Sequence, residues 1–387
     1  MKLIYSIGAK FAGGGIGTPA YHAVRGFLAR DCLQRLLCGS YQSSKIPERT
    51  IRSLGIISRG LRKLATYDPS GWLWYLESII YDRWAMRHLH DGDTLYVWGN
   101  YGLSSLRRAK QLDMMTIVER ASTHPLYQAR LLGEEFARWG MTFLSPQPVI
   151  SRAVNELALA DAVTIPSDFV RQSFLAEGFS EEKLIQTSYG VDTNRFYPGN
   201  HDDHPFRVLF LGDVCLRKGV PYLLAAWKLL NWKDAELWLV GRVRNEIQPI
   251  LNLYRHLTGL RLLAFTPDPL PVLQGADIFA LPTVEEGSAL VTYEALACGL
   301  PVITTPNAGS VVRHTIEGFI LPIRDVEAIA HGLERLRANP NLHEYMAEAA
   351  RRRALQFSWQ NYSYHLAENI LSWQKSHLML RAKKCID

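Results

Sequence analysis

The chain has 387 residues, 48% of them hydrophobic and 21% charged, which is typical of a globular protein with two domains. Its five scattered cysteines form no CxxC pair and no cluster with histidine, which argues against a structural zinc site and for a reducing compartment. The net charge of +6 suits an acidic substrate or an anionic surface, and no recognisable nucleic-acid-binding module accompanies it.

The predicted strand 3–7 is followed by the glycine-rich segment 12–17 and by a helix that begins near Thr18. The segment satisfies the dinucleotide-binding pattern GxGxxA, although no acidic residue closes the next candidate strand, 33–38. The apolar run after Lys2 is too short for a secretory signal, and no stretch approaches the roughly 20 apolar residues of a membrane span. We therefore expect a cytoplasmic protein.

Residues 45–64 carry six basic side chains against one acidic side chain. Apolar residues recur there at helical spacing, namely Ile51, Leu54, Ile57, Leu61 and Leu64. This pattern predicts a basic amphipathic helix that lies on the inner face of an anionic membrane, with Trp72 and Trp74 as interfacial aromatic residues. An ordinary surface helix packed on its own domain is the alternative.

Polar residues follow a predicted strand at 114–118, where the ligand crevice of an open α/β sheet lies. His124 is the candidate for a residue at this crevice, with Arg120 and Glu119 behind it, although a histidine before proline is often a loop or capping residue. The upstream segment Asp91-Gly92-Asp93 precedes a strand and is read as a turn, so that no metal site is predicted.

A polar segment rich in glycine and proline, 199–205, predicts a domain boundary near residue 200. Beyond it, the basic pair Arg217-Lys218 lies at a turn from strand to helix, where a pyrophosphate finds positive charge and free N–H donors. Strands near 236–240 and 261–265 alternate with helices, as in a doubly wound parallel sheet. The strand ends should rim the crevice where a nucleobase stacks, through Gly241, Arg242, Phe265 and Thr266.

Residues 277–305 predict a strand, a polar turn, a helix from about Ser288 and a second strand. The start of this helix offers unpaired N–H groups and a positive dipole end, which suit a diphosphate, and Gly287 lets the backbone come close to a ligand. Because carboxylates repel phosphate, Glu286 and Glu294 are expected to accept hydrogen bonds from sugar hydroxyl groups.

The Glu286–Glu294 spacing, followed by the residues ALACGLPV, resembles the retaining glycosyltransferases of family four, or glycosyl transferases group 1. The segment from Gly190 to Pro198 and Lys218 also match this family, whereas Asp213 stands where its members carry an arginine. The resemblance implies the GT-B architecture: an α/β fold of two Rossmann-like doubly wound domains facing across a cleft. The implied divisions are an acceptor-side domain (1–199), a nucleotide-sugar-binding domain (200–358) and a final helix that crosses back (359–387).

The resemblance also implies roles for individual residues. Glu286 would lie beside the donor sugar and Glu294 would hold the ribose, while Lys218 and Arg217 stabilise the leaving diphosphate and His124 serves the acceptor. The diphosphate would also meet the glycine loop and the helix start, through Gly14, Gly15, Gly17, Gly287, Ser288, Ala289, Leu290 and Val291.

The expected activity is sugar transfer from a UDP- or GDP-sugar to a glycan, lipid-linked or small-molecule hydroxyl group, with retention and without a metal. No cofactor is expected, since the nucleotide-sugar is a co-substrate. Asp213 keeps a catalytically silent sugar-nucleotide or glycan-binding protein open as an alternative. A nicotinamide-dependent dehydrogenase is a further alternative, and a phosphorylase would need a pyridoxal lysine to which nothing in the sequence points.

Overall fold

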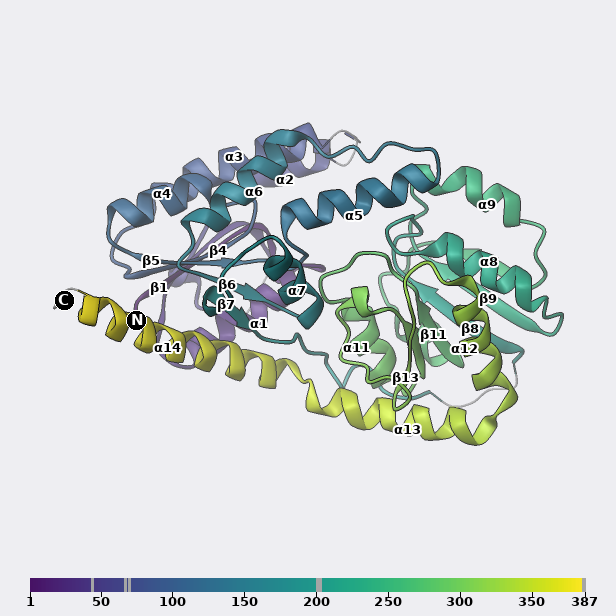
Figure 1. Ribbon diagram of the computed structural model, residues 1–387. Coiled ribbons are helices and arrows are strands. Elements are labelled where there is room, and N and C mark those ends of the chain that lie inside the picture. The colour runs from purple at the N-terminus through teal and green to yellow at the C-terminus, as the bar shows by residue number, and fades with distance from the viewer. Residues whose placement is uncertain (43–44, 66–67, 69–70, 200–203, 385–387) are drawn as a thin grey trace.

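The computed structural model describes residues 1–42, 45–65, 68, 71–199 and 204–384. Within these residues the chain forms two parallel β-sheets, one after the other, with helices on both faces of each (Figure 1). The predicted linker falls partly on residues 200–203, which lie outside the described residues. The α/β fold with two Rossmann-like doubly wound sheets, inferred from the sequence, is confirmed.

The first sheet has seven strands in the order β3-β2-β1-β4-β5-β6-β7. Its strands are β1 (Leu3–Phe11), β2 (Leu33–Tyr41), β3 (Ile51–Ser53), β4 (Thr94–Trp98), β5 (Met115–Glu119), β6 (Ala162–Ile165) and β7 (Leu184–Gln186). The accompanying helices are α1 (Gly17–Leu28), α2 (Ile56–Ala65), α3 (Trp72–Met86), α4 (Leu103–Gln111), α5 (Pro125–Arg138), α6 (Gln147–Leu159) and α7 (Asp168–Ala176).

The second sheet has six strands in the order β10-β9-β8-β11-β12-β13. Its strands are β8 (Phe206–Leu211), β9 (Ala235–Val240), β10 (Leu260–Leu263), β11 (Ile278–Leu281), β12 (Val302–Thr304) and β13 (Gly318–Ile320). The helices are α8 (Val220–Leu230), α9 (Gln248–Tyr254), α10 (Leu270–Gln274), α11 (Leu290–Ala297), α12 (Val326–Ala338), α13 (Pro340–Gln356) and α14 (Trp359–Lys384).

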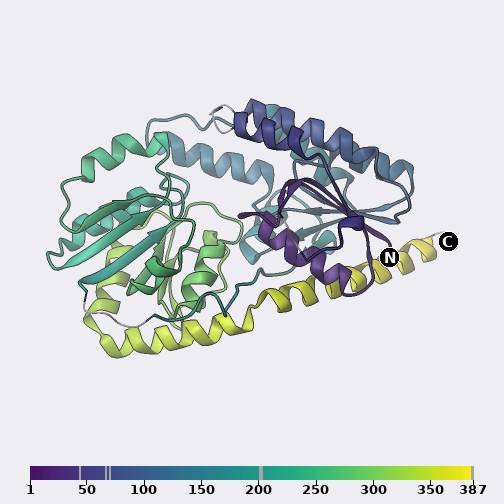
Figure 2. The ribbon, with the colours of Figure 1, turned by 180° about the vertical axis from the view of Figure 1, so that it is seen from behind.

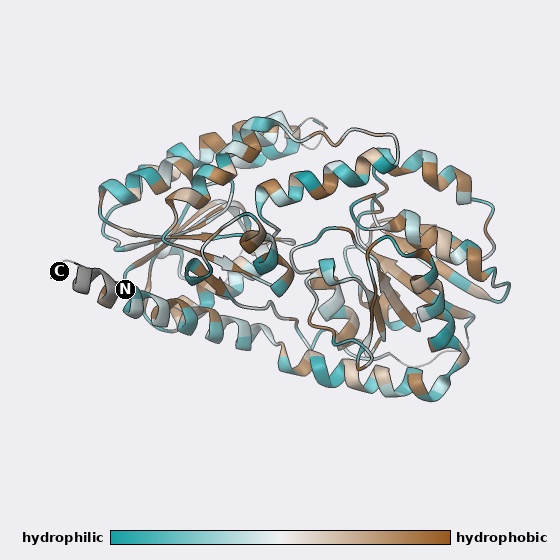
Figure 3. Ribbon diagram, viewed as in Figure 1, coloured by the Kyte–Doolittle hydropathy of each residue, from teal (hydrophilic) through white to brown (hydrophobic). Residues whose placement is uncertain are grey.

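The central strands of both sheets are buried on their two faces and are therefore largely continuous apolar runs, whereas the edge strand β10 is mostly exposed. In β1, every residue except Lys10 is buried, and hydrophobic strands fill the centre of both domains (Figure 3). The strand order reverses between β1 and β4 in the first sheet and between β8 and β11 in the second. Ligands of open α/β sheets bind at such reversals, beyond the carboxyl ends of the strands.

The last two helices join the domains. Helix α13 packs against α11 and α12 of the second domain, and α14 runs along α1 of the first, as seen from the back in Figure 2. An ion pair of 2.8 Å between Arg30 and Glu368 and a hydrogen bond from Asn369 to Thr187 hold α14 in place. No helix in the described part of the chain is long and apolar enough to span a bilayer.

The prediction of one helix over residues 45–64 is wrong in its first half. Residues 48–50 form a 3₁₀ turn, and 51–53 form strand β3, which pairs in parallel with β2. Gly55 has φ of 68°, a left-handed conformation outside the helical region, and α2 begins directly after it. The free edge of β2 thus takes Ile51 into the sheet although its spacing also fits a helix, because tertiary pairing overrides local preference.

The contact between α1 and α14 can be tested by making the same glycine-to-alanine substitution in two different helices. A Cβ at Gly26 of α1 would lie 2.3 Å from the Ser363 carbonyl oxygen of α14, whereas a Cβ at Gly133 of α5 meets nothing within 4 Å. We expect Gly26→Ala to lower the free energy of unfolding by about 1–2 kcal/mol through overpacking. Gly133→Ala should raise it by about 0.5–1 kcal/mol, since alanine favours the helix. Denaturant unfolding that moved both variants in the same direction would contradict this account of the helix contact.

Candidate functional site

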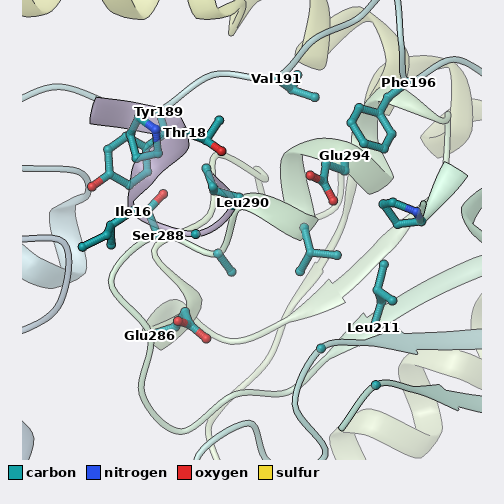
Figure 4. A pocket seen from close by; sticks show the side chains of 18 of the residues that line it. Ile16, Thr18, Tyr189, Val191, Phe196, Leu211, Glu286, Ser288, Leu290 and Glu294 are labelled. Carbon is teal, nitrogen blue, oxygen red and sulfur yellow. The ribbon is translucent and has the colours of Figure 1, made fainter. Parts of the chain in front are cut away.

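A cleft of about 740 Å³ lies between the two domains, at the strand-order reversals of both sheets. Its walls come from the glycine loop after β1, from the turns after β8, β9 and β11, and from the start of α11. Figure 4 shows Glu286 on the turn after β11 and Glu294 on α11, both lining the cleft. The cleft therefore brings together segments that are almost 300 residues apart in the chain.

Most of the candidate residues line this cleft. They are Gly14, Gly15, Lys218, Gly241, Arg242, Phe265, Thr266, Glu286, Ser288, Ala289, Leu290, Val291 and Glu294. The backbone N–H groups of Leu290 and Val291 begin α11, so the intrahelical hydrogen-bond pattern leaves them without partners. The positive end of this helix thus faces the cleft beside the Ser288 side chain.

Two of the predicted glycines do not line the cleft, and each permits a close backbone contact instead. A Cβ at Gly17 would lie 2.3 Å from the Lys10 carbonyl oxygen, so glycine lets α1 begin close to the end of β1. A Cβ at Gly287 would lie 1.6 Å from the Ala121 carbonyl oxygen of the first domain. Gly287 therefore allows the turn after β11 to touch the other domain.

Glu286 is held by two cations. Its carboxylate forms ion pairs with Arg217 at 3.0 Å and with Lys218 at 3.1 Å. Burial alone would raise the pKa of Glu286, but the two cations outweigh it and lower the pKa to about 2. Arg217 reaches Glu286 without lining the cleft, and this carboxylate raises the pKa of the guanidinium. Glu286 is thus a fixed anion at physiological pH.

The neighbouring residue, Glu285, takes part in the contact between the domains, which the sequence analysis did not predict. Its carboxylate is fully buried and accepts hydrogen bonds from Thr123 and Gln128 of the first domain, at 2.8 and 3.0 Å. It also lies 3.4 Å from Arg217, whose guanidinium donates to the Glu285 carbonyl oxygen. The same guanidinium therefore serves a residue of the cleft and a residue of the domain contact. No local pattern in the sequence marks Glu285, because its partners lie more than 150 residues away.

Glu294 lies on the cleft without an ion pair to any described residue. Burial raises its pKa to about 7, although the charge of Arg195 opposes this shift. A carboxylate in this state is a strong hydrogen-bond acceptor that gains from a donor group on a ligand. Arg195 also lines the cleft, where it forms an exposed ion pair with Asp268, and the sequence analysis did not single it out.

Asp213, which replaces the arginine typical of similar proteins, lies on the cleft and is neutralised. Arg244 donates to its carboxylate from the turn after β9, with a distance of 3.0 Å from Nε. The adjacent rim carries Arg242, whose guanidinium lies 5.1 Å from the centre of the Phe265 ring. Arg217, four residues further on, is engaged by both carboxylates of the Glu285-Glu286 pair.

His124 does not line the cleft. It is the N-cap residue of α5, is only 6% exposed, and packs its ring against Phe174 with centroids 5.1 Å apart. Burial lowers the pKa of His124 to about 4, so the ring is neutral at physiological pH. His124 thus stands at the N-cap position, but its side chain makes no capping hydrogen bond.

Arg120, placed behind His124 by the sequence analysis, lines a second cavity of about 220 Å³ in the first domain. This cavity also contacts Trp74, Asn100, Ser122 and Gln128. The Asn100 Oδ1 atom is buried there without a hydrogen-bond partner, and the Arg120 guanidinium donates to Gln128 at 3.2 Å. Ala121 lines the main cleft while its two neighbours line this cavity, so the two spaces lie on either side of one loop.

The role of the Arg217 guanidinium, which Glu285 and Glu286 share, can be tested against the exposed ion pair of Arg244 with Asp213. Arg217→Ala leaves the buried Glu285 and Glu286 carboxylates with fewer partners, and we expect it to lower the free energy of unfolding by about 2–3 kcal/mol. Arg244→Ala removes an exposed pair with Asp213 and should cost about 1 kcal/mol or less. Equal losses in urea unfolding would show that Arg217 has no special place in the structure.

Comparisons with known proteins agree with this geometry. Residues 205–339 match the family model of the glycosyl transferases group 1. A D-inositol 3-phosphate glycosyltransferase of Salinispora arenicola is 39% identical over 202 residues, which cover 44% of this chain and 45% of that protein. A GDP-mannose-dependent alpha-(1-6)-phosphatidylinositol monomannoside mannosyltransferase of Mycolicibacterium smegmatis is 30% identical over 250 residues, covering 57% of this chain and 65% of that one.

The chain spans about half the length of most of the curated relatives that it matches. A match to a solved structure covers nearly the whole of both chains. The Anabaena protein HepE, solved in complex with UDP-glucose, superposes with a TM-score of 0.69 at 16% identity, over 96% of this chain and 99% of that one. Residues 205–339 thus match the glycosyl transferases group 1, and the chain as a whole, with its two doubly wound sheets, has the GT-B fold.

Proposed function

We propose that this protein transfers a sugar from a nucleotide-sugar, a UDP- or GDP-sugar, to a hydroxyl group of an acceptor, with retention of configuration and without a metal. The observation that carries the proposal is the arrangement of one cleft. Within it, the ion-paired Glu286, the unpaired Glu294 and the start of α11 lie on the same side of the strand-order reversal. This set provides one acceptor for a sugar, one acceptor for a ribose and N–H donors for the phosphates between them.

Each part of the donor has a matching part of the cleft. The ribose hydroxyl groups donate to Glu294, which has no competing cation in contact. The diphosphate accepts from the N–H groups that begin α11 and approaches the glycine loop at Gly14 and Gly15. The base stacks at the rim near Phe265, where Arg242 adds a cation. The sugar then extends toward Glu286 and Lys218.

The chemical step follows from what surrounds the sugar. The bond between C1 and the phosphate oxygen breaks while the acceptor oxygen bonds to C1 from the same face, and the acceptor proton passes to the leaving phosphate. Lys218 and the start of α11 stabilise the negative charge that grows on the leaving diphosphate, an electrostatic role that requires no metal. Glu286 is kept ionised by its cations and serves to orient the sugar through its hydroxyl groups.

The acceptor side of the proposal is the second cavity, on the other side of the loop that carries Ala121. Its polar lining includes Arg120 and the unsatisfied oxygen of Asn100, which suits a ligand rich in hydroxyl groups. Glycan, lipid-linked and small-molecule acceptors all offer such groups. The relatives from Salinispora and Mycolicibacterium are described as acting with inositol-containing molecules, which supports a polyol as the acceptor class.

A catalytically silent binding protein with the same cleft is the second candidate. It is favoured by the Asp213–Arg244 pair, which puts a neutral pair where similar proteins have a free arginine. Release of nucleotide from the donor in the presence of a lipid or glycan acceptor distinguishes the two, because a binding protein releases none.

The donor is identified by a thermal-shift screen of UDP-, GDP-, ADP- and dTDP-sugars, and the best ligand then tests the roles of the residues. Glu294→Ala should weaken its binding about 10- to 150-fold, since a hydrogen bond to a charged group contributes about 1.5–3 kcal/mol. Lys218→Ala should chiefly lower turnover and leave affinity nearly unchanged, while Lys228→Ala, on the exposed side of α8, should change neither. Calorimetry that showed wild-type affinity for Glu294→Ala would refute the assignment of the ribose site.

Affinity should also depend on pH in a defined direction. The pKa of Glu294 is raised to about 7 by burial, so the carboxyl group is largely protonated in the free protein below that pH. Because ribose hydroxyl groups bind the ionised form better, affinity for the sugar nucleotide should rise from about pH 5.5 to about pH 8. The dependence should disappear in Glu294→Gln. A wild-type affinity that falls over this range would contradict the sign.

A further inference from the structure

Helices α2 and α3 pack against each other, and polar side chains lie on their buried sides. Most of their buried residues are polar or charged: Ser58 on α2, and Glu77, Ser78 and Asp82 beside Tyr81 and Ala85 on α3. Ser58 and Arg62 both donate to the fully buried Glu77 carboxylate, at 2.9 and 3.2 Å. Polar side chains of both helices, including all of their acidic ones, therefore point into the protein.

The sides that remain on the surface are apolar. The large exposed hydrophobic residues are Ile56, Ile57 and Leu64 on α2 and Trp72, Leu73, Leu76 and Ile80 on α3. Ile56 is 79% exposed, and both Ile57 and Leu64 are 58% exposed. Single exposed apolar side chains are ordinary, but a group on two adjacent helices marks a surface that another apolar phase covers. We call this group, on α2 and α3, the apolar face.

The exposed charged side chains of α2 and α3 themselves have one sign, although the Asp68 carboxylate between the two helices accepts from the Leu73 N–H group at 2.7 Å. Leu73, Leu76, Ile80, Arg83 and Arg87 follow one another at intervals of three and four residues, so the basic residues continue the apolar stripe of α3. Arg59 and Lys63 are exposed on α2. The two acidic residues of these helices, Glu77 and Asp82, are both buried, and Asp82 pairs with Arg152 at 2.6 Å. The exposed side chains of the two helices are therefore either hydrophobic or basic.

We propose that the apolar face docks on an anionic bilayer surface. Aliphatic and tryptophan side chains would enter the boundary between head groups and acyl chains, and the arginines would remain at the level of the lipid phosphates. A second copy of the chain is a poorer occupant, because a two-fold interface would bring the same cations together from both sides. This proposal goes beyond sugar transfer and requires no catalytic step.

Contacts behind the two helices hold the apolar face in a fixed position. The Tyr101 hydroxyl accepts from Arg62 at 3.0 Å and from the Trp74 indole at 3.1 Å, and Arg62 also donates to the Gly8 carbonyl of β1. Trp74 in turn lines the second cavity. Docking through α2 and α3 would therefore place that cavity beside the bilayer surface. Figure 1 shows both helices on the outside of the first domain, away from α14.

Vesicle binding of the full chain tests the proposal without any assay of activity. We expect sedimentation with vesicles containing roughly one third phosphatidylglycerol in phosphatidylcholine, and at least about tenfold weaker binding to phosphatidylcholine alone. Added salt should weaken the binding to anionic vesicles. Failure of the wild-type chain to bind anionic vesicles would overturn the proposal, and the proposed sugar transfer would stand unaffected.

Matched variants locate the surface. Ile57→Glu/Leu64→Glu should lose at least about tenfold in vesicle affinity, as should Arg59→Glu/Arg83→Glu. Leu229→Glu/Leu253→Glu changes side chains of similar exposure, 58% and 67%, on α8 and α9 of the other domain and should bind as wild type. Unchanged melting temperatures and sugar-nucleotide affinity confirm that each variant is folded.

Two results would overturn the assignment of this face. One is vesicle binding by Ile57→Glu/Leu64→Glu equal to that of the wild type. The other is a wild-type dimer in light scattering that Ile57→Glu/Leu64→Glu converts to a monomer, because the apolar face would then be a subunit interface.

Discussion

The structure of the cleft depends on one guanidinium group, that of Arg217, which two adjacent carboxylates share. Its ion pair with Glu286 keeps that carboxylate ionised on the wall of the cleft. It also lies beside the carboxylate of Glu285, which accepts hydrogen bonds from the other domain. Since Arg217 follows β8 and the two glutamates follow β11, this contact crosses the strand-order reversal of the second sheet. The Arg217 side chain thus links the position of Glu286 on the cleft wall to the contact between the domains.

The domain contact itself is built from polar groups. Glu135 of α5 is fully buried and accepts from Tyr222 of α8 and pairs with Arg324, both at 2.7 Å. Gly287 allows a close backbone approach to Ala121, and Ser167 donates to the Gly287 carbonyl group. Water can replace such contacts when the domains separate, whereas a large apolar interface would resist opening. The proposed sugar transfer requires a cleft that admits its substrate and then excludes water, and a polar domain contact of this kind allows such opening and closing.

Whether a residue of the cleft can be predicted from the sequence depends on how far along the chain its interaction partners lie. Glu286, Glu294 and Lys218 could be placed because each belongs to a short strand–turn–helix segment whose geometry is local. Glu285 could not, because its partners Thr123 and Gln128 meet it only when the two domains come together. The distance of His124 from β5 predicts a crevice residue, but in the structure His124 directly precedes α5 and its ring packs against Phe174.

The apolar face shows a further limit of periodicity. Helical spacing of Ile57, Leu61 and Leu64 identifies one side of a helix, and the usual assumption is that this side faces the core. The buried side of α2 instead faces Glu77 of α3. The carboxylate of Glu77 would be buried without a cation if Arg62 of α2 did not turn inward. Arg62 does turn inward to this carboxylate, and the opposite, apolar side of α2 is left on the surface. The orientation of the helix is therefore set by a residue on its neighbour, which no pattern within α2 contains.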